Sequence, residues 1–168
     1  GVTTYAYTKL NQLAGTTDAL SNRTTYSYDA DGDLTLVQAP LSRTTQYAYD
    51  SLDRLTTVTD PMGHVTATHY DAVGNVTSVT DPLGHTTSYA YNSMNRVTTI
   101  TDALAHATTI LYDTEGRVTG VIDAANRRST YAYDNAGRVL ASTDPLNHTT
   151  TYLYDAVGNL IRVLDPLN

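Results

Sequence analysis

Short runs of alternating apolar and polar residues recur along the chain with a fixed period of 21 residues. In residues 85–91, the sequence His-Thr-Thr-Ser-Tyr-Ala-Tyr places both tyrosines on one side of an extended segment, as the period of two in a β-strand requires. A second run, residues 96–101 with the sequence Arg-Val-Thr-Thr-Ile-Thr, consists mainly of Val, Thr and Ile, which favour strands. Each copy therefore predicts two strands, and eight copies fill the 168 residues.

The second strand of each copy does not alternate cleanly. Its two apolar columns, represented by Val76 and Val79, are three residues apart and cannot both face one side of a regular strand. A β-bulge would reconcile the columns, and so would a sheet that is covered in part on both faces. The sequence leaves both options open.

Two tight turns separate the strands. The first turn, as in residues 71–74, has only Gly, Asn or Asp in its fourth position, and these residue types best tolerate a positive φ. The Asp at its head is expected to accept hydrogen bonds from backbone N–H groups two residues on. The second turn, residues 81–84 with the sequence Asp-Pro-Leu-Gly, shares the Asp at its head and the Gly at its fourth position. Both turns predict antiparallel hairpins.

Sixteen strands of about 6 to 7 residues each follow from this pattern. Because the same bend recurs in every copy, we predict an all-β antiparallel β-hairpin repeat array that coils into a spiral ribbon, tube or shell wall. Residues 1–168 are predicted to be a single array and, since neither terminal copy is atypical, a window of a longer array. The alternative is a parallel β-solenoid, in which each copy is one rung and advances about 4.8 Å.

Three columns define the repeat and are its predicted structural residues: a Tyr at the end of the first strand, the Asp that follows it, and a Gly in the first turn. Their members are Tyr28, Tyr49, Tyr70, Tyr91, Tyr112, Tyr133 and Tyr154; Asp29, Asp50, Asp71, Asp113, Asp134 and Asp155; and Gly32, Gly74, Gly116, Gly137 and Gly158.

Composition narrows the function classes. The chain has 31 Thr and 14 Tyr but no Phe, Trp or Cys, so strands are favoured and disulfides are excluded. The formal net charge of −7 argues against nucleic acid as a partner. The sequence has no apolar span of about 20 residues, and membrane insertion is therefore not expected.

The motif Tyr-x-Tyr-Asp-x-x-Gly, followed by Asp-Pro-Leu-Gly-His-Thr-Thr, resembles the tyrosine–aspartate (YD) repeats of the Rhs family. Bacterial Rhs proteins, shell components of insecticidal toxin complexes, wall-associated proteins and animal teneurins share these repeats. The best matches are residues 47–50, 131–134 and 152–155, whereas Thr68 and Ile110 replace the first tyrosine. The resemblance implies a β-ribbon that spirals into a hollow shell around a cargo, often a toxin, or into a barrel used in cell contact.

Candidate chemistry is sparse. One column holds His64, His85, His106 and His148, but equivalent columns of a meander lie about 9.6 Å apart, too far for two ligands of one Zn²⁺. Residues 29–33 resemble the opening of a Ca²⁺ loop and lack its later ligands. No Ser occupies a nucleophile elbow, so we expect no enzyme activity, metal or cofactor.

The glycosylation triplet Asn-x-Ser/Thr occurs at Asn22, Asn75 and Asn147, although chance explains three triplets in so Thr-rich a chain. We predict a non-catalytic structural protein, the wall of an extracellular tube, fibre or shell. The alternatives are a segment of an Rhs-type cocoon that encapsulates a toxin, and a cell-surface module that binds glycan or protein. Expected partners are further copies of the same array, an enclosed cargo or a surface glycan, with an extracellular or cell-surface location.

Overall fold

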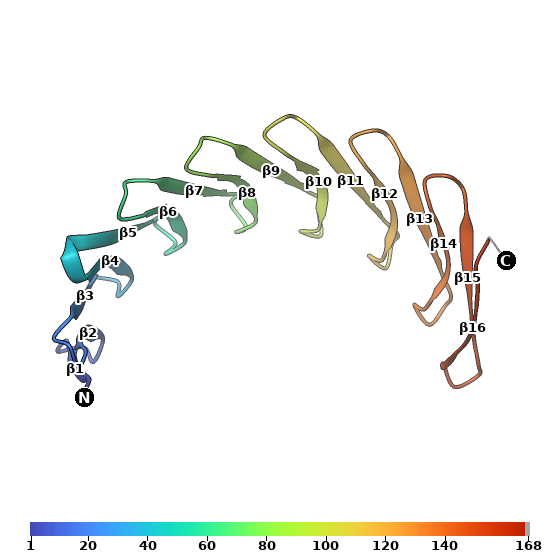
Figure 1. Ribbon diagram of the computed structural model, residues 1–168. Helices are drawn as coiled ribbons and strands as arrows, with labels where there is room; N and C mark the ends of the chain where they lie inside the picture. The colour runs from blue at the N-terminus through green and yellow to red at the C-terminus, as the bar shows by residue number, and fades with distance from the viewer. Residues whose placement is uncertain (167–168) are drawn as a thin grey trace. The chain divides into compact units, whose positions relative to one another are not determined.

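The computed structural model describes residues 1–166, and they are almost entirely β-structure. Sixteen antiparallel strands lie in one open sheet in chain order (Figure 1). They are β1 (Thr4–Tyr7), β2 (Leu13–Thr17), β3 (Arg23–Tyr28), β4 (Leu34–Ala39), β5 (Arg43–Tyr49), β6 (Leu55–Thr59), β7 (Val65–Tyr70), β8 (Val76–Thr80), β9 (Thr86–Tyr91), β10 (Val97–Thr101), β11 (Ala107–Tyr112), β12 (Val118–Ile122), β13 (Arg128–Tyr133), β14 (Val139–Thr143), β15 (Thr149–Tyr154) and β16 (Leu160–Leu164). The antiparallel hairpin array is confirmed, and the parallel solenoid is wrong.

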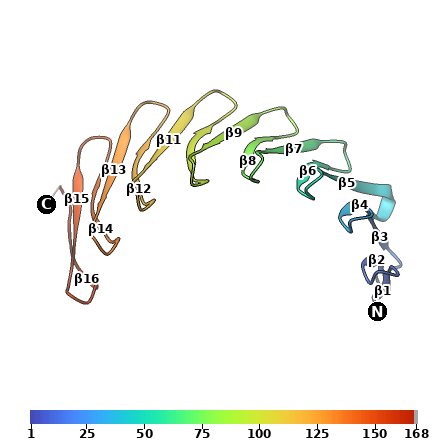
Figure 2. The ribbon, with the colours of Figure 1, turned by 180° about the vertical axis from the view of Figure 1, so that it is seen from behind.

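The chain divides into two units, Gly1–Thr86 and Thr87–Asn168. Within each unit the first turns connect the two strands of a hairpin, and the second turns lead to the next hairpin at the opposite end of the strands (Figure 2). Most strands have five or six residues, shorter than the predicted 6 to 7, because the residue expected to begin a strand closes the preceding turn, as His85 and Arg96 do. The one helical segment in residues 1–166 is a short 3-10 turn, η1 (Pro40–Ser42).

A β-bulge interrupts the second strand of all eight hairpins at the same place. In the β3–β4 hairpin, Tyr28 pairs with Leu34 and Ser27 pairs with Leu36, so Thr35 is the extra residue. The Thr35 hydroxyl donates a hydrogen bond of 3.2 Å to the Ser27 carbonyl across the hairpin. The bulge predicted as one way to reconcile the two apolar columns is therefore present.

The bulge brings both apolar columns to the tyrosine side of the sheet. Tyr26 pairs with Val37 just as Tyr28 pairs with Leu34, and directly paired residues share a face. The six residues of β9 alternate between exposed and half-buried, with the half-buried ones on the tyrosine face. One face is thus aromatic and aliphatic, and the opposite face carries mostly Thr, Ser and Ala.

The turns adopt the conformation that their composition predicts. At the fourth position of a first turn, Gly74 has φ of 98° and Asn95 has φ of 57°, both in the left-handed region. The Gly74 N–H donates to the Asp71 carbonyl at 3.2 Å, and the Asp71 N–H donates to the Asn75 carbonyl at 2.9 Å. The second turn around Asp81 closes with the same two bonds, donated by Gly84 and Asp81.

Residues 39–43 show what the head Asp contributes. Ala39 replaces the Asp there, so no side-chain acceptor is available for the turn's backbone N–H groups. This second turn forms η1 instead, and both Leu41 and Ser42 have positive φ, at 64° and 57°. The loss of one carboxylate is accompanied by a different backbone path, which indicates that the Asp selects the turn type.

No apolar side chain in residues 1–166 is fully buried. The tyrosines and valines of the aromatic face are half-buried, and their burial comes from neighbours in the same layer. The chain has an accessible surface of 11253 Å², whereas a globular protein of 18.2 kDa exposes about 8,100 Å². The excess of about 3,000 Å² follows from a sheet with one layer.

Candidate functional site

The contacts that join one hairpin to the next gather at the two ends of the strands. In each unit we call the end with the first turns the tyrosine rim, because the Tyr column precedes these turns. We call the opposite end, with the second turns, the histidine rim. The tyrosine rim comprises residues 8–12, 29–33, 50–54, 71–75, 92–96, 113–117, 134–138 and 155–159, and the histidine rim comprises residues 18–22, 39–43, 60–64, 81–85, 102–106, 123–127 and 144–148.

Six of the column tyrosines tie their hairpin to the preceding one through the side-chain hydroxyl. The Tyr70 hydroxyl on β7 donates a 2.9 Å hydrogen bond to the Leu55 carbonyl, the first residue of β6. The same bond, with a separation of 15 residues, is made by Tyr28, Tyr49, Tyr112, Tyr133 and Tyr154. A polar tip and an apolar ring make Tyr suited to this half-buried position.

An arginine at the last position of several first turns adds a second link to the next hairpin. Arg54 bonds to the Asp50 carboxylate at 2.7 Å, donates to the Asp71 carbonyl at 2.8 Å and stacks 4.7 Å from the centre of the Tyr70 ring. In the other unit, Arg117 repeats all three contacts, and Arg96 and Arg138 stack on the tyrosines that follow them. We call this set of contacts the arginine staple.

The head carboxylates of the turns each hold several backbone N–H groups. Asp71 Oδ1 accepts from the Val73 N–H at 3.0 Å and the Asn75 N–H at 2.8 Å. Side-chain hydrogen bonds lower the pKa of Asp50 through Arg54, of Asp81 through His85 and of Asp155 through Asn159. These carboxylates are therefore held ionised by the turns that they organise.

We expect the array to lose stability in acid. A carboxyl whose pKa lies below its ordinary value of 3.8 stabilises the fold above that pH, and this stability is lost as the pH falls through the lowered pKa. Eleven head carboxyls share this shift, and Asp33 is the one described Asp with a raised pKa. Circular dichroism melts should show a falling midpoint below about pH 4, and a constant midpoint down to pH 3 would contradict this account.

The histidine column lies on the histidine rim, and each member is bound by its own turn. In the pairs headed by Asp60, Asp81, Asp102 and Asp144, the imidazole Nδ1 lies 2.9 to 3.0 Å from the carboxylate Oδ2. No group of three or more His, Cys, Asp or Glu side chains in residues 1–166 is placed to hold a metal ion. The histidine side chains are half exposed, and each one bonds to the head carboxylate of its own turn.

The segment that resembles a Ca²⁺ loop forms an ordinary first turn with an unusual last residue. Asp29 Oδ1 accepts hydrogen bonds from the N–H groups of Asp31, Gly32 and Asp33. Asp33 occupies the position of the staple arginine, and its Oδ2 is buried without a hydrogen-bond partner. Burial, followed by the charges of Asp53, Asp29 and Asp31, raises the pKa of Asp33. The turn at residues 29–33 therefore lacks the arginine staple that Arg54 forms in the turn of the next hairpin.

Replacing Asp33 with Arg is expected to raise the melting midpoint by about 2 to 4 °C. The new guanidinium would meet the Asp29 carboxylate, the Asp50 carbonyl and the Tyr49 ring, as Arg54 does one repeat later. Asp31→Arg is the matched control, because it changes the charge equally at an exposed site outside the staple. An equal gain from both variants would assign the effect to net charge alone.

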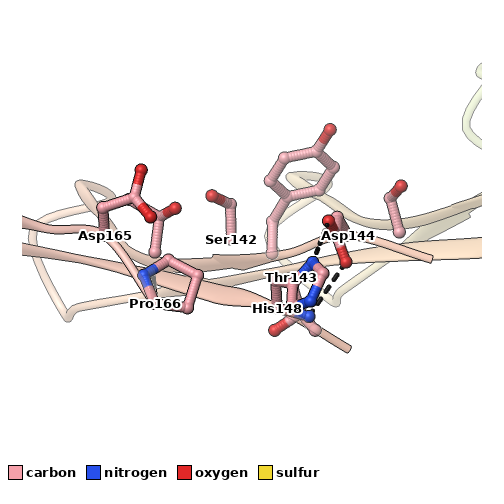
Figure 3. A pocket seen from close by; sticks show the side chains of 9 residues that line it. Ser142, Thr143, Asp144, His148, Asp165 and Pro166 are labelled. Atoms are coloured by element: carbon pink, nitrogen blue, oxygen red, sulfur yellow. Dashed lines mark hydrogen bonds and ion pairs between the residues drawn. The ribbon is translucent and has the colours of Figure 1, made fainter. Parts of the chain in front are cut away.

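A pocket of about 330 Å³ beside the last complete second turn contains Ser, His and Asp side chains (Figure 3). His148 bonds to Asp144 through Nδ1, and the Ser142 hydroxyl lies 3.3 Å from the Tyr152 hydroxyl. No hydrogen bond in the described residues joins His148 to a hydroxyl group. The arrangement therefore lacks the bond between nucleophile and base on which a hydrolytic triad depends.

The three glycosylation triplets occupy different environments. The side-chain amides of Asn22 and Asn75 donate 2.9 Å hydrogen bonds to Asp18 and Asp71, the heads of their own turns. Asn147 lies at the fourth position of a second turn, exposed and with φ of 65°. Glycosylation at these sites stays a prediction.

The sequence reasoning placed the Tyr, Asp and Gly columns but missed the staple. The signal was present, because Arg54, Arg96, Arg117 and Arg138 stand in one column, four residues after the turn head. A cation at that position next to a Tyr column predicts stacking only once the distance between hairpins is known. The tyrosine hydroxyl bond had no sequence signal of its own.

Comparison with protein families finds repeated matches to one model. It is described as RHS Repeat and matches residues 7–42, 28–65, 70–107, 112–146 and 136–168. A comparison with curated protein sequences finds no match.

Solved structures with a similar fold include parts of Tc toxin complexes. The Photorhabdus luminescens Tc holotoxin pore aligns with a TM-score of 0.66 at 20% identity, covering 84% of this chain and 9% of that one. The crystal structure of TcdB2-TccC3 aligns with a TM-score of 0.72 at 17% identity, covering 99% of this chain and 12% of that one. This likeness concerns the fold, and the chain spans about a tenth of the length of these solved chains.

Proposed function

Because the chain belongs to the RHS repeat family, we propose that it is a non-catalytic structural protein whose β-ribbon forms the wall of an extracellular tube, fibre or shell. The observation that carries this proposal is the absence of a fully buried apolar side chain in residues 1–166, combined with links that pass from hairpin to hairpin at the tyrosine rim. Such a layer separates two spaces and has no interior of its own.

The repeated bulge supports coiling of the ribbon. A bulge bends its strand and increases the local twist, and here it recurs once in every hairpin. Equal bends at equal intervals accumulate in one direction. The tyrosine hydroxyl bonds and the arginine staples hold neighbouring hairpins in a fixed register. Each hairpin therefore adds its bend to that of the one before it.

A second candidate is a segment of a cocoon that encloses a toxin. The similarity to TcdB2-TccC3 and to the Tc holotoxin pore favours it, because those structures contain ribbons of the same fold within toxin complexes. Under either candidate the partners are further repeats of the same kind, and the cocoon adds an enclosed cargo. No helix in the described residues has the length and apolar character needed to cross a membrane.

Small-angle X-ray scattering and electron microscopy test the wall function. The chain should have a radius of gyration clearly above the roughly 15 Å of a compact globule of this length, and longer arrays should appear hollow with a thin wall. A radius near 15 Å with a solid particle would reject the wall. Cargo protected from protease inside the particle would favour the cocoon over an empty tube or fibre.

A further inference from the structure

The second turn at residues 39–43 leaves an arginine without an ion partner. Arg43 and Arg127 both stand at the last position of a second turn. Arg127 bonds through Nε to the head carboxylate of its turn, Asp123, at 2.7 Å. Ala39 heads the other turn, and Arg43 makes no ion pair or side-chain hydrogen bond within residues 1–166. The Arg43 guanidinium is therefore free to pair with a carboxylate from outside the chain.

Two pockets flank this turn on the histidine rim. One, of about 460 Å³, includes Arg23 and Thr25, and the other, of about 400 Å³, includes Arg43 and Thr24. Thr24 and Thr25 are successive residues of β3, so their side chains lie on opposite faces of the sheet, and the two pockets open on different faces. The pockets meet at the rim, where both are lined by Asn22, Pro40 and Leu41.

The two pockets form a positive area in a negative unit. Residues 1–86 contain nine Asp against one Lys and three Arg. The charged side chains that line the pockets are Arg23, Arg43 and Asp18. Both Asp18 oxygens accept hydrogen bonds within their own turn, and Arg23 has no ion partner among the described residues. Two guanidinium groups without partners favour a ligand that carries oxyanions.

The larger pocket is suited to hydroxyl groups as well as to charge. Its lining contains no carboxylate, and it includes the hydroxyls of Ser21, Thr25 and Ser42 and the amide of Gln38. Hydroxyls and amides both donate and accept hydrogen bonds, as the hydroxyls of a sugar do. Leu41, which is 91% exposed, offers an apolar surface to the C–H groups of a sugar ring.

We propose that the two pockets bind an oligosaccharide of uronic acids, with its carboxylates on Arg43 and Arg23 and its hydroxyls in the larger pocket. A carboxylate is the partner that this chain itself provides for Arg127, and a guanidinium pairs with it through parallel hydrogen bonds. A polyuronate carries such a group on every ring, so it engages both faces where it crosses the rim. The site needs only the fold of residues 18–43 and goes beyond the wall function.

Isothermal titration calorimetry of the whole chain with trigalacturonate, at pH 7 in low salt, tests the site. We expect saturable binding that weakens as salt is added. A neutral trisaccharide such as maltotriose should bind at least about tenfold more weakly, because it lacks the charged hydrogen bonds. No saturable binding of trigalacturonate, or equal affinity for maltotriose, would overturn the proposal. A triglutamate peptide that binds as tightly would overturn the sugar part and leave a site for carboxylates.

Ala39→Asp supplies the missing head carboxylate. The new Asp should pair with Arg43 as Asp123 pairs with Arg127, so the affinity for trigalacturonate should fall at least about tenfold. Ala39→Asn is the matched control, because Asn92 shows that Asn can head a turn, and it leaves Arg43 without a carboxylate. An equal loss in both variants would assign binding to the backbone path of the turn and contradict the pairing with Arg43.

Substitution of the two arginines tests their charge directly. Arg43→Gln and Arg23→Gln should each weaken the binding of trigalacturonate at least about tenfold. The midpoint of a circular dichroism melt should not change, because neither side chain has a partner to lose. Arg128→Gln is the matched control, since Arg128 shares the column of Arg23 but lines neither pocket. Equal weakening by all three variants would assign binding to net charge and overturn the site.

Discussion

Tyr70→Ala is expected to lower the free energy of unfolding by about 2 to 4 kcal/mol. The change removes a half-buried ring from the aromatic face, the 2.9 Å hydrogen bond to the Leu55 carbonyl and the surface on which Arg54 stacks. Tyr70→Phe removes the hydroxyl alone and is expected to cost about 1 kcal/mol. Urea unfolding followed by circular dichroism measures both values.

Tyr7 supplies the matched control in the same column. Tyr7 is 60% exposed, and its hydroxyl makes no hydrogen bond among the described residues. Tyr7→Ala should therefore cost less than about 1 kcal/mol. Equal losses at positions 7 and 70 would show that the contacts between hairpins contribute little and that the tyrosines act within their own hairpins.

Gly116→Val is expected to lower the free energy of unfolding by about 1.5 to 4 kcal/mol. Gly116 has φ of 83°, where a β-branched side chain is strained by about 1 to 3 kcal/mol. A Cβ atom at this position would also overlap the Arg96 guanidinium and push it away from the Tyr112 ring. Loss of this stacking adds about 0.5 to 1 kcal/mol.

A variant at Gly137 separates the backbone strain from the loss of arginine stacking. Its φ of 81° is nearly the same, but a Cβ atom there would meet nothing within 4 Å. Gly137→Val therefore reports the backbone strain alone and should be milder than Gly116→Val in the same denaturation experiment. A larger loss at position 137 would mean that the arginine contact has no part in the effect.

The sequence was informative where a residue acts on its own backbone. The Gly, Asn and Asp column predicted positive φ, as Gly74 and Asn95 show, and two apolar columns three residues apart indicated a bulge as one of two explanations. These features depend on local sterics and on the period of two in a strand, which a repeated sequence shows eight times.

Contacts between hairpins were not predictable in the same way. The bond from Tyr70 to Leu55 and the stacking of Arg54 depend on the twist between strands, which no column of residues encodes. The turn at Ala39 is similar, because the missing Asp signals a change without specifying the new backbone path. Strand lengths were overestimated for a simpler reason, since His85 and Arg96 accept the hydrogen bonds that close their turns, and neither residue type marks a turn in the sequence.

The link between Tyr70 and Leu55 reaches only the adjoining hairpin, as do the others of its kind. Deleting or duplicating 21 consecutive codons would rejoin equivalent partners on both sides of the junction and leave the remaining links unchanged. Unequal recombination within such a gene is therefore structurally neutral, and lineages can alter the size of the product without passing through a misfolded ancestor.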